Sequence, residues 1–118
     1  MAGQVDGNYL GSFVAGGTIP AHVRVKLSGG KIAIAGDAED ADEIGTSRCY
    51  AELDQPLSVR LATAAGTVKV MAGAAITAGD QIESAASGKV ITKAAGALWG
   101  IALTAASGDG SIIEAIRK

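Results

Sequence analysis

The sequence predicts an all-β fold, a small β-barrel or sandwich built from two similar strand-turn-strand halves, with an extended N-terminal arm. Glycine supplies 17 of the 118 residues and recurs in dipeptides between short apolar segments, which favours tight turns over long helices. Within those segments apolar and polar residues alternate, as they do in strands that bury one face. The two halves of the chain also repeat one order of strands and turns.

Four segments carry the alternation most clearly. Every second side chain in them is apolar, and most of the residues between are polar or small, so one strand face can be buried. The segments are HVRVKL at 22–27, PLSVRL at 56–61, TVKV at 67–70 and LWGIAL at 98–103.

The first of these segments predicts which side chains enter the core. Val23, Val25 and Leu27 share one face and are expected to be buried. Arg24 and Lys26 share the opposite face and are expected to point into solvent, where charged residues usually lie.

The chain is expected to form a single β domain at residues 18–118, preceded by an arm at residues 1–17. A chain of 118 residues has the size of one domain. The arm lies outside both repeated halves, and its apolar residues are set among glycines, so it cannot form a core by itself.

Within the domain, residues 18–62 and 75–116 are predicted pseudo-repeats. Ile19 aligns with an isoleucine 57 positions later, and Gly30 with a glycine 58 positions later, so one single-residue shift relates the two. Gly45 then matches Gly100. Closing two such halves against each other would hide strand edges, which otherwise promote aggregation.

The candidate partner-contact residues lie mainly in the arm. Three fates are open for the arm: it packs back on its own domain, adds to a partner surface, or is disordered. Trp99, the single tryptophan, belongs either to the core or to a subunit contact. The candidate contacts are Tyr9, Leu10, Phe13, Val14 and Trp99.

Composition limits the classes of partner. The net charge of −2 and the pI of about 5.2 predict no nucleic-acid partner, because such binding needs a basic field. The longest mostly apolar run, residues 94–106, is too short and glycine-broken to cross a membrane, and no secretory signal is recognised. Aromatic residues make up only 3% of the chain, so the core depends on small aliphatic side chains and we expect oligomerisation to add stability.

Residues for catalysis are scarce. His22 is the single histidine and is expected on the exposed polar face beside Arg24, while Cys49 is expected to be a small buried residue. No nucleophile, base and orienting group can be assembled from these two. SAASGK, at 84–89, and SGDGSI, at 107–112, lack the residues of phosphate and dinucleotide loops and are predicted turns. We therefore expect no enzyme and no cofactor.

One acidic segment stands out at residues 37–43, DAEDADE. Its spacing lacks the glycine and the final glutamate of a calcium-binding EF-hand loop, so no metal site is predicted. A solvated loop is expected, with a cation site or a contact to a basic partner as the open alternatives. Its carboxylates are Asp37, Glu39, Asp40, Asp42 and Glu43.

The C-terminal part of the chain carries a set of recognisable motifs. They are AITAGD at 75–80, ASGKV at 86–90, GIAL at 100–103 and AASGDG at 105–110, followed by a final apolar strand. In these motifs the sequence resembles a family of phage capsid decoration proteins, also called cement or head-stabilising proteins. The N-terminal half follows the same family pattern, so the resemblance extends over residues 18–118.

The resemblance implies a structural virion protein that decorates and stabilises an icosahedral phage capsid. Such a protein is made in the host cytoplasm, forms a homotrimer and binds across major capsid protein subunits on the capsid exterior. The resemblance implies no catalytic residue, cofactor or metal. The residues alone leave open a non-catalytic β-barrel binding module, associated with a tail or with the host, that recognises sugar or peptide. Scarce aromatic residues disfavour a sugar-binding platform.

Overall fold

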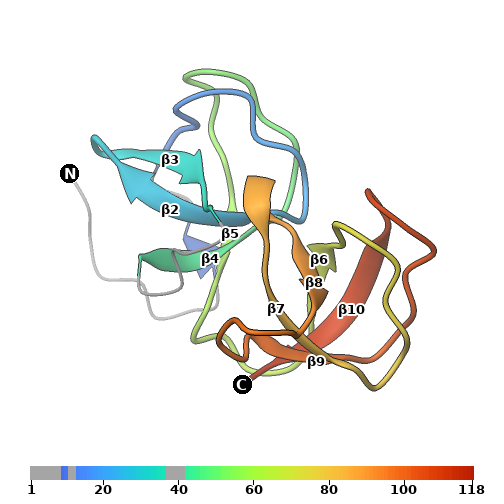
Figure 1. Ribbon diagram of the computed structural model, residues 1–118. Helices are drawn as coiled ribbons and strands as arrows, with labels where there is room; N and C mark the ends of the chain where they lie inside the picture. Colours follow the sequence, from blue (N-terminus) through green and yellow to red (C-terminus); the bar gives the residue numbers. More distant parts are fainter. Residues whose placement is uncertain (1–8, 11–12, 37–41) are drawn as a thin grey trace.

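The computed structural model describes residues 9–10, 13–36 and 42–118, and these form two antiparallel five-stranded sheets (Figure 1). The all-β prediction is confirmed, and the one helical element described is a single 3₁₀ turn, Ala86–Gly88. Every hydrogen-bonded pair of named strands lies within one of the two sheets, and none joins one sheet to the other. The N-terminal sheet and the C-terminal sheet occupy opposite sides of the molecule in Figure 1.

The N-terminal sheet has the strand order β1-β5-β4-β2-β3. The predicted segments 22–27 and 56–61 supply β2 and β5, because their alternating apolar residues place one face against the core. The strands are β1 Tyr9–Leu10, β2 Arg24–Ser28, β3 Lys31–Ile34, β4 Glu43–Ser47 and β5 Val59–Leu61.

The C-terminal sheet has the order β6-β10-β9-β7-β8, which is the same arrangement moved five strands along the chain. The predicted segments 67–70 and 98–103 supply β6 and β9. The strands are β6 Val68–Met71, β7 Gln81–Ser84, β8 Val90–Thr92, β9 Gly100–Ala102 and β10 Ile112–Arg117.

Hydrogen bonds outside the strands repeat as well. Ile19 and Ala51 exchange two backbone bonds in the N-terminal half, of 2.8 and 2.9 Å. Ile76 and Ala106 exchange two in the C-terminal half, of 3.1 and 2.9 Å. The two halves therefore share connections as well as strand order, while their origin by duplication and the boundaries given above stay predictions.

Each sheet has its own core of small aliphatic residues. Val25 and Ile32 are fully buried in the N-terminal core, and Ile82 and Val90 in the C-terminal core. Leu27 is an exception to the predicted pattern, because it is 44% exposed. It lies near the end of β2, where the strand runs out past the core into its turn.

Candidate functional site

The described part of the arm packs against its own sheet. Tyr9 and Leu10 form β1 and pair with Arg60 and Val59 of β5. Phe13 is half-buried against the N-terminal core. Val14, also half-buried, bridges to Pro56. Of the three fates considered for the arm, its described residues follow the first, and their contact with a partner stays a prediction.

Trp99 lies in the C-terminal core and is only 2% exposed. Its indole Nε1 donates to both carboxylate oxygens of Glu43, at 3.1 and 3.2 Å. The guanidinium of Arg117 stacks over its ring, 4.4 Å from the centroid. The side chain is thus held by neighbours within its own chain, and its role as a partner contact also stays a prediction.

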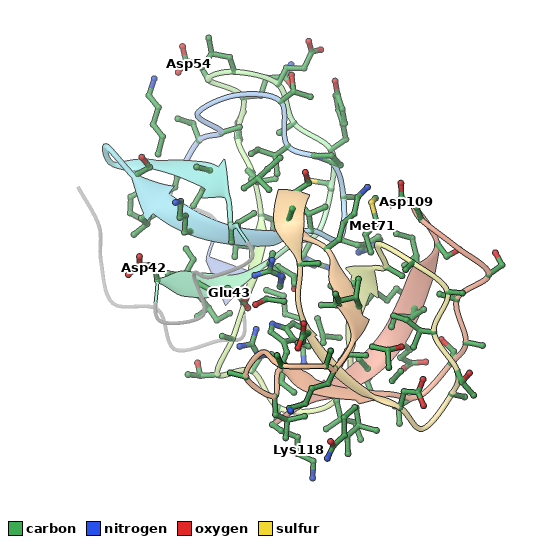
Figure 2. The ribbon with its side chains drawn as sticks, in the orientation of Figure 1. Asp42, Glu43, Asp54, Met71, Asp109 and Lys118 are labelled. Atoms are coloured by element: carbon green, nitrogen blue, oxygen red, sulfur yellow. The ribbon has the colours of Figure 1, made fainter. Side chains whose placement is uncertain are left out.

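Glu43 is not part of a solvated acidic loop, as the sequence suggested, but is the first residue of β4 with a fully buried side chain. Arg24 donates to its Oε1 at 3.2 Å, and Arg117 donates to its Oε2. The carboxylate lies between the two sheets (Figure 2), where two arginines and an indole compensate its charge. Asp42 is exposed, whereas the other three acidic residues of that segment, Asp37, Glu39 and Asp40, lie outside the described residues.

Arg24 is also buried, which corrects the prediction that it faces solvent. Its side chain donates to three carbonyl oxygens besides Glu43, and two of them, at Ala85 and Lys89, belong to the C-terminal half, at 2.5 and 3.0 Å. The third is that of Gly36, at 2.9 Å. A buried guanidinium is tolerated when its donors are satisfied in this way. Arg24, Glu43, Trp99 and Arg117, which we call the inter-sheet cluster, therefore fasten one sheet to the other.

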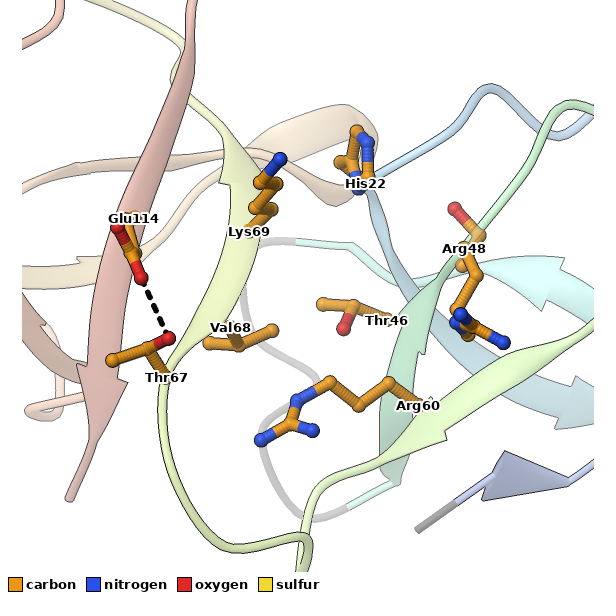
Figure 3. A pocket seen from close by; sticks show the side chains of 9 residues that line it. His22, Thr46, Arg48, Arg60, Thr67, Val68, Lys69 and Glu114 are labelled. Atoms are coloured by element: carbon orange, nitrogen blue, oxygen red, sulfur yellow. Dashed lines mark hydrogen bonds between the residues drawn. The ribbon is translucent and has the colours of Figure 1, made fainter.

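A separate cleft opens between the sheets, with a volume of about 330 Å³. It is lined by residues from β4 and β5 on one side and from β6 and β10 on the other. Figure 3 shows Lys69 and His22 along one side of the opening, with Thr46 at its centre and Arg60 opposite. The lining residues are His22, Thr46, Ser47, Arg48, Arg60, Thr67, Val68, Lys69 and Glu114.

The cleft is predominantly cationic. Arg48, Arg60 and Lys69 each carry a positive charge, and Glu114 carries the single negative charge of the lining. Glu114 accepts a 2.7 Å hydrogen bond from the hydroxyl of Thr67. Sequence reasoning did not find this cleft, because its charged residues come from four separated segments and form no local motif.

His22 lies at the rim in a left-handed backbone conformation, with φ of 64°, just before β2. Partial burial lowers the pKa of its imidazole below the usual 6.5, and the nearby positive charge of Lys69 lowers it further. The ring is therefore mostly neutral at pH 7. Cys49 is not among the residues that line the cleft.

This shift gives a testable pH dependence. The folded protein binds the His22 proton more weakly than the unfolded chain does, so stability should be lost as pH falls below about 6.5 towards the folded-state pKa. We expect the one histidine ring signal in NMR spectra to titrate with a midpoint below 6.5, and Lys69→Gln to raise that midpoint. A midpoint at or above 6.5 would contradict the arrangement. His22→Asn is the matched control for the stability measurement, since asparagine tolerates a positive φ and does not titrate.

Cys49 is exposed, contrary to the expectation that it is buried. It lies in a bend after β4, where the chain has left the sheet. Among the described residues no three histidine, cysteine, aspartate or glutamate side chains gather as they would to hold a metal ion. These residues likewise contain no helix long and apolar enough to span a membrane.

One solved phage protein shares this architecture. The chain matches the N base of the head fiber gp8.5 of bacteriophage phi29 with a TM-score of 0.77, over 93% of its own length and 94% of that chain. The two share a fold. Their sequences are 16% identical, so the likeness to the head fiber base concerns the fold alone. No protein-family model and no curated protein sequence matches the chain.

Proposed function

We propose that this chain is a structural phage virion protein that decorates an icosahedral capsid and stabilises it by binding across major capsid protein subunits. The observation that carries the proposal is the fold, which matches a head fiber base over almost the whole of both chains. The decoration-protein motifs at residues 75–110 support it independently, because they come from the sequence and not from the fold.

The inter-sheet cluster suits a protein that must resist being pulled apart. A structural attachment protein needs a rigid body more than a reactive group. Among the described residues every buried side-chain nitrogen and oxygen has a hydrogen-bond partner, so burying these polar side chains leaves none of them unsatisfied. The Arg24 and Glu43 contacts would keep the two sheets in one orientation while either sheet is loaded.

An exposed apolar face offers a surface for attachment. Ile112 and Ile116 lie four residues apart on one face of β10 and are 42% and 39% exposed, with the exposed Glu114 between them. Leu103, just after β9, is 41% exposed. Ile116 pairs across the sheet with Ile101. Exposed apolar side chains gathered on one sheet face are typical of surfaces that bind other proteins. Several such faces joined in a homotrimer would raise the effective concentration of each at its capsid site.

Capsid binding by the purified protein is the direct test. We expect a homotrimer in light scattering and cosedimentation with expanded capsids, with little binding to unexpanded ones. The decorated capsids should withstand higher temperature than bare ones before they release DNA. A monomer without affinity for capsids would contradict the proposal.

A shortened protein tests the arm residues in the same assay. Because Ala15 is fully buried, the deletion should end at Ser12, which removes Tyr9 and Leu10 but keeps the residues that complete the core. If the arm contacts the capsid, this protein should remain folded and bind expanded capsids more weakly. Undiminished binding would exclude Tyr9 and Leu10 from the contact.

A further inference from the structure

The cleft between the sheets has a charge opposite to that of the chain. Three cationic side chains and one carboxylate line it, in a protein with a net charge of −2. The cations come from separate places in the fold: Arg48 follows β4, Arg60 lies in β5 and Lys69 lies in β6. Concentrating cations in one concave place raises the local potential for an anion well above that of the rest of the surface.

The contacts of Arg60 and Lys69 leave the positive charge of these two side chains largely uncompensated by carboxylates of the described residues. Arg60 donates to the carbonyl oxygen of Ala65 at 2.6 Å, which orients the guanidinium but does not neutralise it. Glu114 lies opposite Lys69 in the strand register, yet its bonded oxygen Oε2 accepts from Thr67. No ion pair joins Lys69 to a carboxylate among the described residues. A ligand with carboxylate oxygens could therefore pair with Lys69 and Arg60 without displacing an existing ion pair of either.

The rest of the lining indicates what kind of anion fits. Val68 is the only aliphatic residue in it, and none of the lining residues is a phenylalanine, tyrosine or tryptophan. A pocket for an apolar small molecule would be mostly hydrophobic, and a site for single-stranded nucleic acid would offer aromatic rings for base stacking. The hydroxyl of Thr46 can donate to a ligand oxygen, whereas that of Thr67 already donates to Glu114. At about 330 Å³ the cleft has room for one or two acidic side chains.

We infer that the cleft is a binding site for carboxylate side chains presented by an acidic segment of a partner protein. Lys69 and Arg60 supply the charge from opposite sides, and Thr46 lies between them. Glu114 repels a carboxylate ligand, so we expect one acidic side chain to bind weakly and two together to bind more tightly. That the partner is a capsid subunit rests on the proposed function, whereas the site itself rests on the cleft.

The probe is a short acetylated and amidated peptide of aspartate and glutamate, titrated into the isotope-labelled full chain and followed by NMR. The peptide of asparagine and glutamine with the same length is its control. We expect shifts at Thr46, Thr67 and Lys69 with the acidic peptide only. The affinity should fall as sodium chloride is raised, because salt screens partly exposed charges.

Single substitutions give effects of opposite sign. Lys69→Gln should weaken binding about twofold to fivefold, the range for one partly exposed ion pair. Arg60→Gln together with it should weaken binding about fourfold to twenty-fivefold, if the two sites act independently. Glu114→Gln should strengthen binding, since glutamine keeps an oxygen for Thr67 and loses the repulsive charge. Lys118→Gln removes the same charge from an exposed terminus outside the cleft and should change nothing.

Four results would overturn the inference: equal binding of the amide peptide, equal effects of Lys69→Gln and Lys118→Gln, tighter binding of inorganic phosphate than of the acidic peptide, or equal binding of a single-stranded oligonucleotide. Capsid cosedimentation is measured separately. Capsid binding without peptide binding would exclude the cleft as a carboxylate-binding site but would leave the proposed function intact. Peptide binding without capsid binding would support the carboxylate-binding site but would exclude a capsid subunit as its partner.

Discussion

Glu43→Gln should destabilise the folded protein by about 3–5 kcal/mol, because removing one partner of a buried ion pair leaves the other charge uncompensated. In this structure the loss is shared by two arginines. The side chain of Arg24 is fully buried, and that of Arg117 is only 26% exposed. Glutamine can still accept one hydrogen bond, but it brings no negative charge to hold the two guanidinium groups together.

Trp99 provides the measurement, since it is the single tryptophan and its indole donates to Glu43. Unfolding in guanidinium chloride, followed by its fluorescence at one fixed protein concentration, should show a lower midpoint for Glu43→Gln. Glu52→Gln is the control, because it removes an exposed carboxylate and should change stability by less than about 0.5 kcal/mol. If both variants unfolded at the same denaturant concentration, the cluster would not fasten the sheets.

The sequence predicted the strands well because period-two alternation directly reflects burial of one strand face. Each of the four alternating segments supplies a strand of the structure, and Val23 and Val25 are buried as expected. Leu27 departs from the pattern because alternation says which face a side chain shares, and not how far the neighbouring sheet extends. Cys49 was expected to be buried from its residue type alone, because small apolar residues usually are. It is exposed because it lies in a bend beyond β4.

The inter-sheet cluster could not be predicted in the same way. Arg24 lies between two core valines, and alternation alone assigns it to solvent. Its burial depends on acceptors distant in sequence, since the carbonyl of Lys89 is 65 positions away. Glu43 similarly meets Trp99 and Arg117, at separations of 56 and 74 positions. The partners of such a buried charged residue can be identified only once the fold is known, because they are far apart in the sequence.

The cleft could not be predicted from the sequence for a related reason. Its cations are spread from residue 48 to residue 69, and each one alone is typical of a solvated strand or loop. Net charge averages them against the acidic segment at 37–43, so a chain of charge −2 conceals a local basic site. Only the meeting of β4 and β5 with β6 and β10 creates the local potential.

Gly45→Ala and Gly100→Ala should each destabilise the protein strongly, and by similar amounts, because both glycines lie where a neighbouring strand passes too close for a side chain. A Cβ at Gly45 would lie 2.0 Å from the carbonyl oxygen of Arg60, and one at Gly100 would lie 2.2 Å from that of Ile116. The obstructing atoms belong to the backbone, so a strand must move. We expect a loss of about 3 kcal/mol or more, above the usual cost of overpacking.

Gly17→Ala and Gly108→Ala are the matched controls. A Cβ at either position would meet no atom within 4 Å, and neither glycine has a positive φ. These variants should unfold at or slightly above the denaturant midpoint of the unmodified protein, because alanine restricts the unfolded chain. If Gly45→Ala matched Gly17→Ala, the close approach of β4 to β5 would be wrong. If only one of the two strand glycines proved costly, the two sheets would differ in packing despite their common strand order, and the predicted equivalence of Gly45 and Gly100 would fail with it.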